Sequence, residues 1–307
     1  MSFADTSLII LSVLFGVYGV FCAVECGIAL TMLRPELGGP AKDRKKLAFT
    51  PLWEITNVFL VFGFIGFAVL FSNGLKEVSG AVLSTLSVGF IALLTRACLA
   101  LYIFYQQKKE VSSWIRVLFL LSNLAIPLSF AGAGAYLLTG QTFWQSGTGW
   151  LLMLAALLGL LSIGLAFNST RRGLVSNLFA VWLLVLCFAV PRQLANVGGD
   201  LRAPTPLAVF VLVGGLLLLA TAISDMRKAK SWVRYYAAVI GFLAPLCLIF
   251  SIHPYLVAGK LNLNDAFGAQ AYAPVVLTGL FAALPLIAIG FYVFGKLLKM
   301  PVLDKPL

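Results

Sequence analysis

The chain has 307 residues, of which 61% are hydrophobic and only 11% are charged, and its mean hydropathy is +1.00. A soluble domain carries about 25% charged residues, so the composition excludes a soluble globular protein and indicates a polytopic membrane protein. The net charge of +11 comes from basic residues in short connections between apolar runs. Membrane topology produces that pattern, and we therefore expect no nucleic-acid partner.

Nine apolar runs are long enough to cross a membrane, which takes about 20 residues in a helix. We predict an all-α protein with nine spanning helices at 6–33, 48–72, 79–105, 114–138, 147–167, 173–195, 205–225, 232–252 and 271–297. Most of the 22 Lys and Arg residues follow the first, third, fifth and seventh runs or lie in the C-terminal tail. The positive-inside rule then places the N-terminus outside and the C-terminus in the cytoplasm.

Charged side chains occur well inside these runs at only three positions: Glu25 in the first, Glu54 in the second and Arg96 in the third. Because a charge at membrane depth costs several kcal/mol, on the order given by insertion scales, we interpret the three as a functional site. All three are predicted to lie at similar depth in the cytoplasmic half of the bilayer. Thr56 and Asn57, in the turn after Glu54, are predicted to hold water near it. The alternative is a buried ion pair that only locks helices together.

A repeated sequence pattern links the two halves of the chain. The fourth and the eighth run each begin with a Trp-x-Arg sequence and contain a Pro-Leu further along, and the two copies lie about 120 residues apart. The residues are Trp114, Arg116 and Pro127 in the first copy and Trp232, Arg234 and Pro245 in the second. We predict two duplicated four-helix units, 1–138 and 139–256, followed by a peripheral ninth helix and cytoplasmic tail at 257–307. Only the first unit carries the charged residues.

Metal and haem ligands are scarce. His253 is the only histidine, and the five cysteines lie inside apolar runs without a CxxC pair. A histidine-rich metal site and a bis-histidine haem are therefore excluded, and we expect no metal site in this chain.

Two classes of function fit these residues. The first is a proton-conducting subunit of a respiratory complex. The second is a proton-coupled secondary transporter in which Glu25, Glu54 and Arg96 form the coupling site. Transporters usually place a midplane site between corresponding broken helices of both halves. Because the polar residues here occupy one half and lie off the midplane, the first class is favoured.

Several short motifs resemble subunit II of the cytochrome bd-type quinol oxidases, of which this chain would be a short and divergent member. They are Glu25-Cys-Gly27, Met32-Leu-Arg-Pro35, Pro51-Leu-Trp-Glu54 and Asn57-Val58. The nine-helix layout is also similar to that family. Two departures are Leu52, where the family has a histidine, and Leu101, where many members have an acid.

The resemblance implies a role for each polar residue. Glu54 takes the place of the family's acid on a proton path, and Glu25 stands near its first-helix acid. Trp53 and Arg96 match residues that adjoin a bound structural quinone in some members. No catalytic residue for oxygen chemistry is expected in this chain.

The resemblance also implies the setting of the protein. The chain is expected to bind no haem itself and to pair with a haem-bearing subunit I, whose haems b and d reduce oxygen to water. Small single-helix subunits and membrane lipids are further implied partners. The expected location is the cytoplasmic membrane of a bacterium or archaeon.

Overall fold

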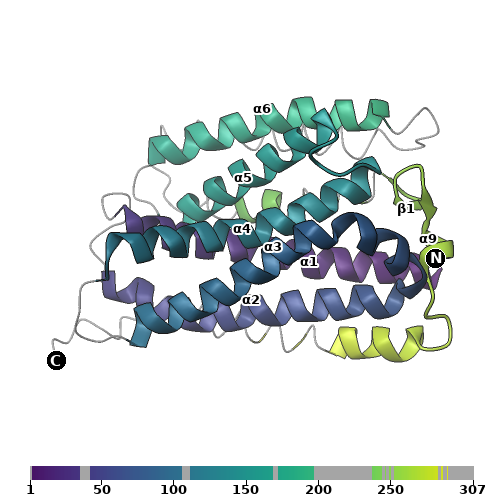
Figure 1. Cartoon of the computed structure of the whole chain (residues 1–307), viewed down its shortest axis with the longest axis horizontal. Coiled ribbons are helices and arrows are strands. Elements are labelled where there is room, and N and C mark those ends of the chain that lie inside the picture. Colours follow the sequence, from purple (N-terminus) through teal and green to yellow (C-terminus); the bar gives the residue numbers. More distant parts are fainter. Residues whose placement is uncertain are drawn as a thin grey trace.

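The protein is a bundle of long helices, shown as a computed structural model in Figure 1. The structure describes residues 2–34, 42–105, 111–168, 172–196, 237–243, 246, 249, 252–282, 285 and 289. The long helices are α1 (Phe3–Leu33), α2 (Lys42–Leu70), α3 (Ser72–Tyr105), α4 (Ser113–Thr139), α5 (Gly147–Asn168) and α6 (Arg172–Asn196). Successive helices run in opposite directions along the bundle (Figure 1).

The first six predicted spans coincide with these helices to within a few residues, except around the second and third. There α2 begins six residues before the predicted start, and the connection predicted between the two runs is helical. The chain turns at Phe71, whose N–H donates to Phe67 O while its own carbonyl accepts from Leu75 N, both at 2.9 Å. Helical hydrogen bonds thus continue through the turn, and α3 is longer than predicted at its N-terminal end.

Four of the described helices, α1, α3, α4 and α5, are long and apolar enough to cross a membrane. The protein is therefore a mostly helical, multi-pass membrane protein. The predicted run at 205–225 lies outside the described residues, and the runs at 232–252 and 271–297 are described only in part, both with helical segments. The nine-helix count, the orientation and the division into two units stay predictions.

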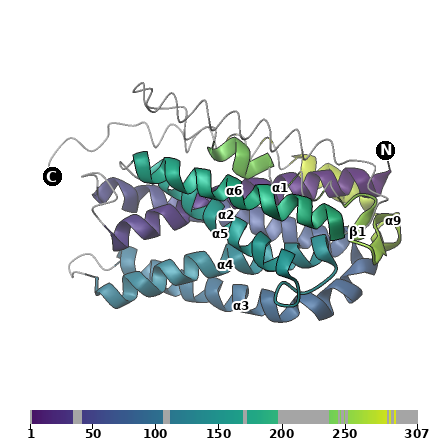
Figure 2. The same ribbon diagram turned by 90° about the horizontal axis from the view of Figure 1, so that it is seen from above.

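Helix α1 lies at the centre of the described bundle. It packs against α2, α4 and α5, whereas α3 packs mainly on α4 (Figure 2). In the most apolar window, 61% of the α1 residues are buried, against 28% for α3. Side chains on α1 therefore face protein on most sides, and a polar group there must find its partners within the bundle.

The crossing of α1 and α5 is a close backbone contact. A Cβ atom at Gly27 would collide with the Gly164 backbone, and one at Gly164 would collide with Ala23 O. Nδ2 of Asn168 donates to Val24 O at 3.1 Å across the same contact. The absence of side chains at this crossing lets α5 lie against α1 beside the candidate site.

A small cap that the sequence did not indicate covers the end of the bundle where α1 begins (Figure 1). It consists of β1 (Tyr255–Val257), β2 (Leu261–Asn262) and α9 (Leu263–Ala266). Ala258 N donates to Leu137 O at 2.9 Å, and Gly268 N donates to Leu70 O at 3.2 Å. His253 Nε2 lies 3.0 Å from Asp5 Oδ1 in the first turn of α1. The cap therefore joins the ends of α1, α2 and α4.

Candidate functional site

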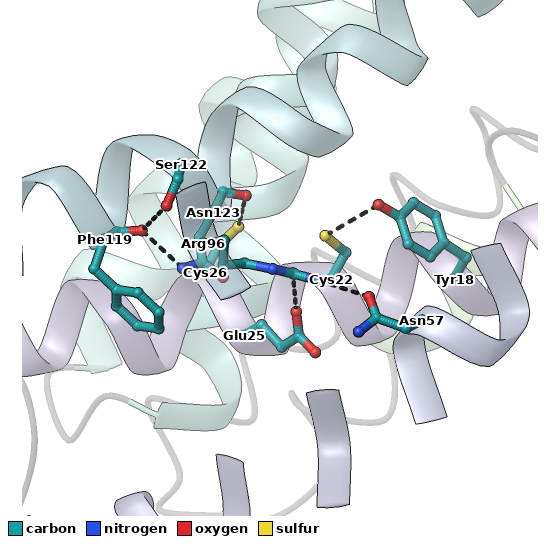
Figure 3. Close-up of polar contacts among 9 residues, drawn as sticks. All are labelled: Tyr18, Cys22, Glu25, Cys26, Asn57, Arg96, Phe119, Ser122 and Asn123. Carbon is teal, nitrogen blue, oxygen red and sulfur yellow. Dashed lines mark hydrogen bonds and ion pairs between the residues drawn. The ribbon is translucent and has the colours of Figure 1, made fainter. Parts of the chain in front are cut away.

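Glu25 and Arg96 form an ion pair inside the bundle (Figure 3). Arg96 Nη1 donates to Glu25 Oε2 at 2.6 Å, and both side chains are 0% exposed. The distance is that of a strong charge-assisted hydrogen bond. The pair joins α1 to α3, so two of the three charges inside the apolar runs are in direct contact.

Asn57 brings α2 to the same place. Its Oδ1 accepts from Arg96 Nη2 at 2.9 Å, so both terminal nitrogens of the guanidinium are engaged. Thr56, which is buried on α2, has its hydroxyl beside the Glu25 carboxylate. The two residues predicted to hold water thus contact the ion pair directly.

The position of the pair follows from the helices that carry it. Glu25 is eight residues from the end of α1 at Leu33, which corresponds to about 12 Å of helix. Arg96 has the long side chain that can reach from α3 across to α1, and it is the largest fully buried residue of the described chain. The pair therefore lies within the apolar part of the bundle, nearer the end at which α1 finishes.

A row of weaker polar groups extends from the pair along α1. The spacing between Tyr18 and Cys22 is four residues, and Cys22 is followed at three and four residues by Glu25 and Cys26. These helical spacings place the side chains on one face of α1. Cys22 Sγ lies 3.7 Å from Tyr18 Oη, and Cys26 Sγ donates to the backbone carbonyl of Asn123 at 3.0 Å. The second contact joins α4 to the cluster.

Glu54 does not join the buried pair. Its side chain is exposed on the surface of the described chain, one helical turn before Asn57. No hydrogen bond or ion pair links it to Glu25 or Arg96 among the described residues. The structure therefore separates the three charges into a buried pair and a single acid on the outer face of α2.

Trp53 and Leu101 complete the account of the predicted residues. Trp53 is half-buried and packs against the main apolar core. Its indole Nε1 is buried, with no hydrogen-bond partner in the described part of the chain. Leu101, at the position where an acid was expected from the resemblance, is 54% exposed on α3 and carries no proton-transferring group.

Sequence reasoning gave no site role to Asn123 or Cys26. Both side chains are 0% exposed and lie against the Glu25–Arg96 pair in Figure 3. Asn123 Nδ2 donates to Phe119 O at 2.7 Å within α4. An amide inside an apolar run was the available signal, but without the α1–α4 contact nothing connected it to Glu25.

The arrangement holds a buried carboxylate whose charge is compensated within the bundle. Among the residues that the structure describes, no group of three or more His, Cys, Asp or Glu side chains could hold an ion. A buried carboxylate is stable only when its charge is compensated. Arg96 supplies the compensation, and Asn57 and Thr56 add hydrogen bonds.

Comparisons with known proteins identify a family and a similar fold. The family "Cytochrome bd terminal oxidase subunit II" matches residues 4–297. A chain of the bd oxidase from Geobacillus thermodenitrificans has a similar fold, with a TM-score of 0.75 and 18% sequence identity over 99% of this chain and 100% of that chain. No curated protein sequence matches. The family match over nearly the whole length shows that this chain belongs to the cytochrome bd terminal oxidase subunit II family.

Proposed function

We propose that this chain is the haem-free subunit of a bd-type oxidase and that it supplies protons from the cytoplasmic side to a haem-bearing partner. The Glu25–Arg96–Asn57 cluster carries the proposal, since it places a fully buried carboxylate about 12 Å of helix from the predicted cytoplasmic end of α1. An intramembrane carboxylate of this kind is typical of proton relays. In this proposal the partner reduces oxygen in the cytoplasmic membrane of a bacterium or archaeon.

Glu54 has a separate part in the proposed path. It lies one turn nearer than Asn57 to the predicted cytoplasmic end of α2, and its side chain is exposed. An exposed acid can exchange protons with water or with a partner subunit that covers this face. Glu25 is the inner group and Glu54 the outer one, with Thr56 and Asn57 between them along α2.

The single histidine supports placing the haems in the partner. His253 is bonded to Asp5 at the end of the bundle where α1 begins, far along α1 from Glu25. Among the described residues, no second histidine is present to form an axial pair with it. We therefore assign haems b and d to the partner subunit, with small single-helix subunits and lipids as additional neighbours of the complex.

The family resemblance implies that Trp53 and Arg96 adjoin a structural quinone, but only Trp53 has the properties of such a neighbour. Arg96 is 0% exposed, and its Nη1 and Nη2 are already bonded to Glu25 and Asn57. Trp53 keeps an indole N–H without a partner among the described residues. The two side chains do not jointly present a surface to a quinone ring, so no step of the proposed function passes through one. Nothing in the described bundle or the comparisons supports the transporter alternative.

The experiment that tests the proposal compares oxidase turnover of three Glu→Gln variants in the purified complex. Glu25→Gln and Glu54→Gln remove the proposed proton carriers, and Glu77→Gln makes the same change on the exposed outer end of α3. We expect the first two to lower oxygen consumption at unchanged haem content and the third to have no effect. Wild-type turnover of both Glu25→Gln and Glu54→Gln would refute the proton role and leave a structural one.

A further inference from the structure

Three polar atoms in the core of the described bundle have no hydrogen-bond partner and belong to the candidate site. They are Oε1 of Glu25, Nε of Arg96 and Oδ1 of Asn123, and all three side chains are 0% exposed. A buried donor or acceptor without a partner costs about 1–3 kcal/mol and more when the group is charged. Nearly all such groups in native proteins are satisfied by protein or by ordered water.

The packing of α3 on α4 brings Arg96 and Asn123 to the same level. A Cβ at Gly89 of α3 would lie 2.9 Å from Ser129 Cβ of α4, which pairs these two positions. The helices are antiparallel, and two turns, about 10 Å, toward the predicted cytoplasmic end lead from Gly89 to Arg96. The same distance along α4 leads from Ser129 to the turn that holds Asn123.

The contact between α1 and α4 brings Glu25 to this level as well. Cys26 Sγ lies 3.0 Å from the backbone oxygen of Asn123, and Glu25 is the preceding residue on α1. Figure 3 draws the Asn123 side chain next to that of Arg96, in agreement with the helix register. Arg96 and Asn123 therefore place two unpartnered atoms in one part of the core, whereas Oε1 of Glu25 points away from both of them.

We infer that an ordered water molecule binds between Arg96 and Asn123 and connects α4 to the Glu25–Arg96 pair. The hydrogen-bond types match one water, because Arg96 Nε–H is a donor and Asn123 Oδ1 is an acceptor. The water oxygen accepts the first bond, and one of its hydrogens donates to Asn123 Oδ1. Buried waters make about two to four such bonds.

This water supports the ion pair of the proposed proton path and therefore rests on the proposed function for its role, although not for its presence. Asn123 is a positioning residue in this arrangement, since it acts on Glu25 through the water and the guanidinium. The water lies on the side of the ion pair away from Asn57. It holds the Arg96 guanidinium in the orientation in which Nη1 bonds the Glu25 carboxylate.

The direct test is a cryo-electron microscopy map of the intact oxidase complex in which ordered waters are visible. We expect density at about 2.7–3.2 Å from both Arg96 Nε and Asn123 Oδ1. A direct bond between these two atoms would overturn the inference. So would the absence of density there in a map that shows buried waters elsewhere in the complex.

A variant pair tests the role of the water separately. Asn123→Leu removes the anchoring oxygen at similar volume. Ser122→Ala is the matched control, because the neighbouring hydroxyl is also buried and, among the described residues, donates to Phe119 O at 2.9 Å within α4. We expect Asn123→Leu to lose the water density. At normal haem content, its turnover should fall roughly tenfold, which corresponds to one weakened transition-state interaction. Ser122→Ala should keep the water density and the wild-type turnover.

Retained water density in Asn123→Leu would show that Asn123 is not the anchor and would contradict the inference. Lost density with unchanged turnover would refute the positioning role. These results are distinguishable from failure of the proposed function, which would show as normal turnover of Glu25→Gln with the wild-type water still present. If Asn123→Leu does not assemble, the wild-type map remains the deciding measurement.

Discussion

Two acid–base pairs lie toward opposite ends of α1, and they differ in their exposure to solvent. Glu25 and Arg96 are 0% exposed at 2.6 Å, whereas the side chains of Asp5 and His253 are 29% and 46% exposed at 3.0 Å. Water can replace either partner of the second pair, whereas the first pair has no exposed surface. Loss of one partner is therefore tolerated at the cap, whereas in the core it leaves the other charge buried without compensation.

The largest effect is expected from removing the cation of the buried pair. Arg96→Leu leaves the Glu25 carboxylate buried without compensation, which costs about 3–5 kcal/mol. We expect a large loss of assembled complex and a lower temperature of thermal unfolding. The yield of haem-containing complex and a melting curve measure both.

A double variant sharpens that prediction. Glu25→Met combined with Arg96→Leu replaces the ion pair with apolar side chains and should recover most of the lost stability, because a buried pair is often no more stable than its apolar substitute. Normal assembly of the single Arg96→Leu variant would contradict the pairing. Failure of the double variant to recover would show that Arg96 has a further structural role.

Removing the buried acid alone is expected to act on function more than on folding. Glu25→Gln keeps a hydrogen-bond acceptor for Arg96 but cannot release a proton. We expect turnover to fall by about 10²-fold, the lower end for loss of a positioned proton-transfer group. Oxygen consumption per haem measures it, and Glu77→Gln on the outer end of α3 serves as the control.

A smaller effect is expected at the exposed acid. Glu54→Gln should change the free energy of unfolding by no more than about 0.5 kcal/mol, as is usual for surface substitutions. It should also lower turnover, but less than Glu25→Gln does. Thermal unfolding and turnover are measured on the same preparation. Strong destabilisation by Glu54→Gln would mean that this residue has a buried partner in the complex.

The smallest effect is expected at the cap. His253→Gln removes the Asp5 pair, and an exposed pair of this kind contributes about 0.2–1 kcal/mol. The contribution should shrink as salt is raised, because exposed charges are screened. Melting temperatures of wild type and variant at low and high salt test this, and a salt-independent difference would contradict an exposed electrostatic contact.

The sequence predicted the helices well because long apolar runs are a strong signal. Six runs became α1 to α6, and the rarity of charges inside apolar runs singled out Glu25 and Arg96, which the structure brings together. The sequence could not show which face of α2 points inward, so Glu54 was grouped with the buried pair and lies outside it. The cap from Tyr255 to Ala266 was missed because short strands and a single helical turn leave no periodic pattern.

Asn123 shows why part of the site was also out of reach. Its role depends on the register of α3 against α4 and on the contact of Cys26 with the Asn123 carbonyl, which is 97 positions away in the chain. Helix–helix registers of this kind are set by side-chain packing and close approach at small residues. A single sequence specifies the small residues but not which helix faces them.

The most direct test of the central claim is the membrane potential generated by the reconstituted complex during oxygen reduction. The measurement compares wild type with Glu25→Gln in vesicles of matched haem content, using a potential-sensitive dye. Proton uptake from the cytoplasmic side through Glu25 predicts that the variant generates little potential, in proportion to its reduced turnover. A full potential at wild-type turnover in Glu25→Gln would contradict the claim that this subunit carries the protons.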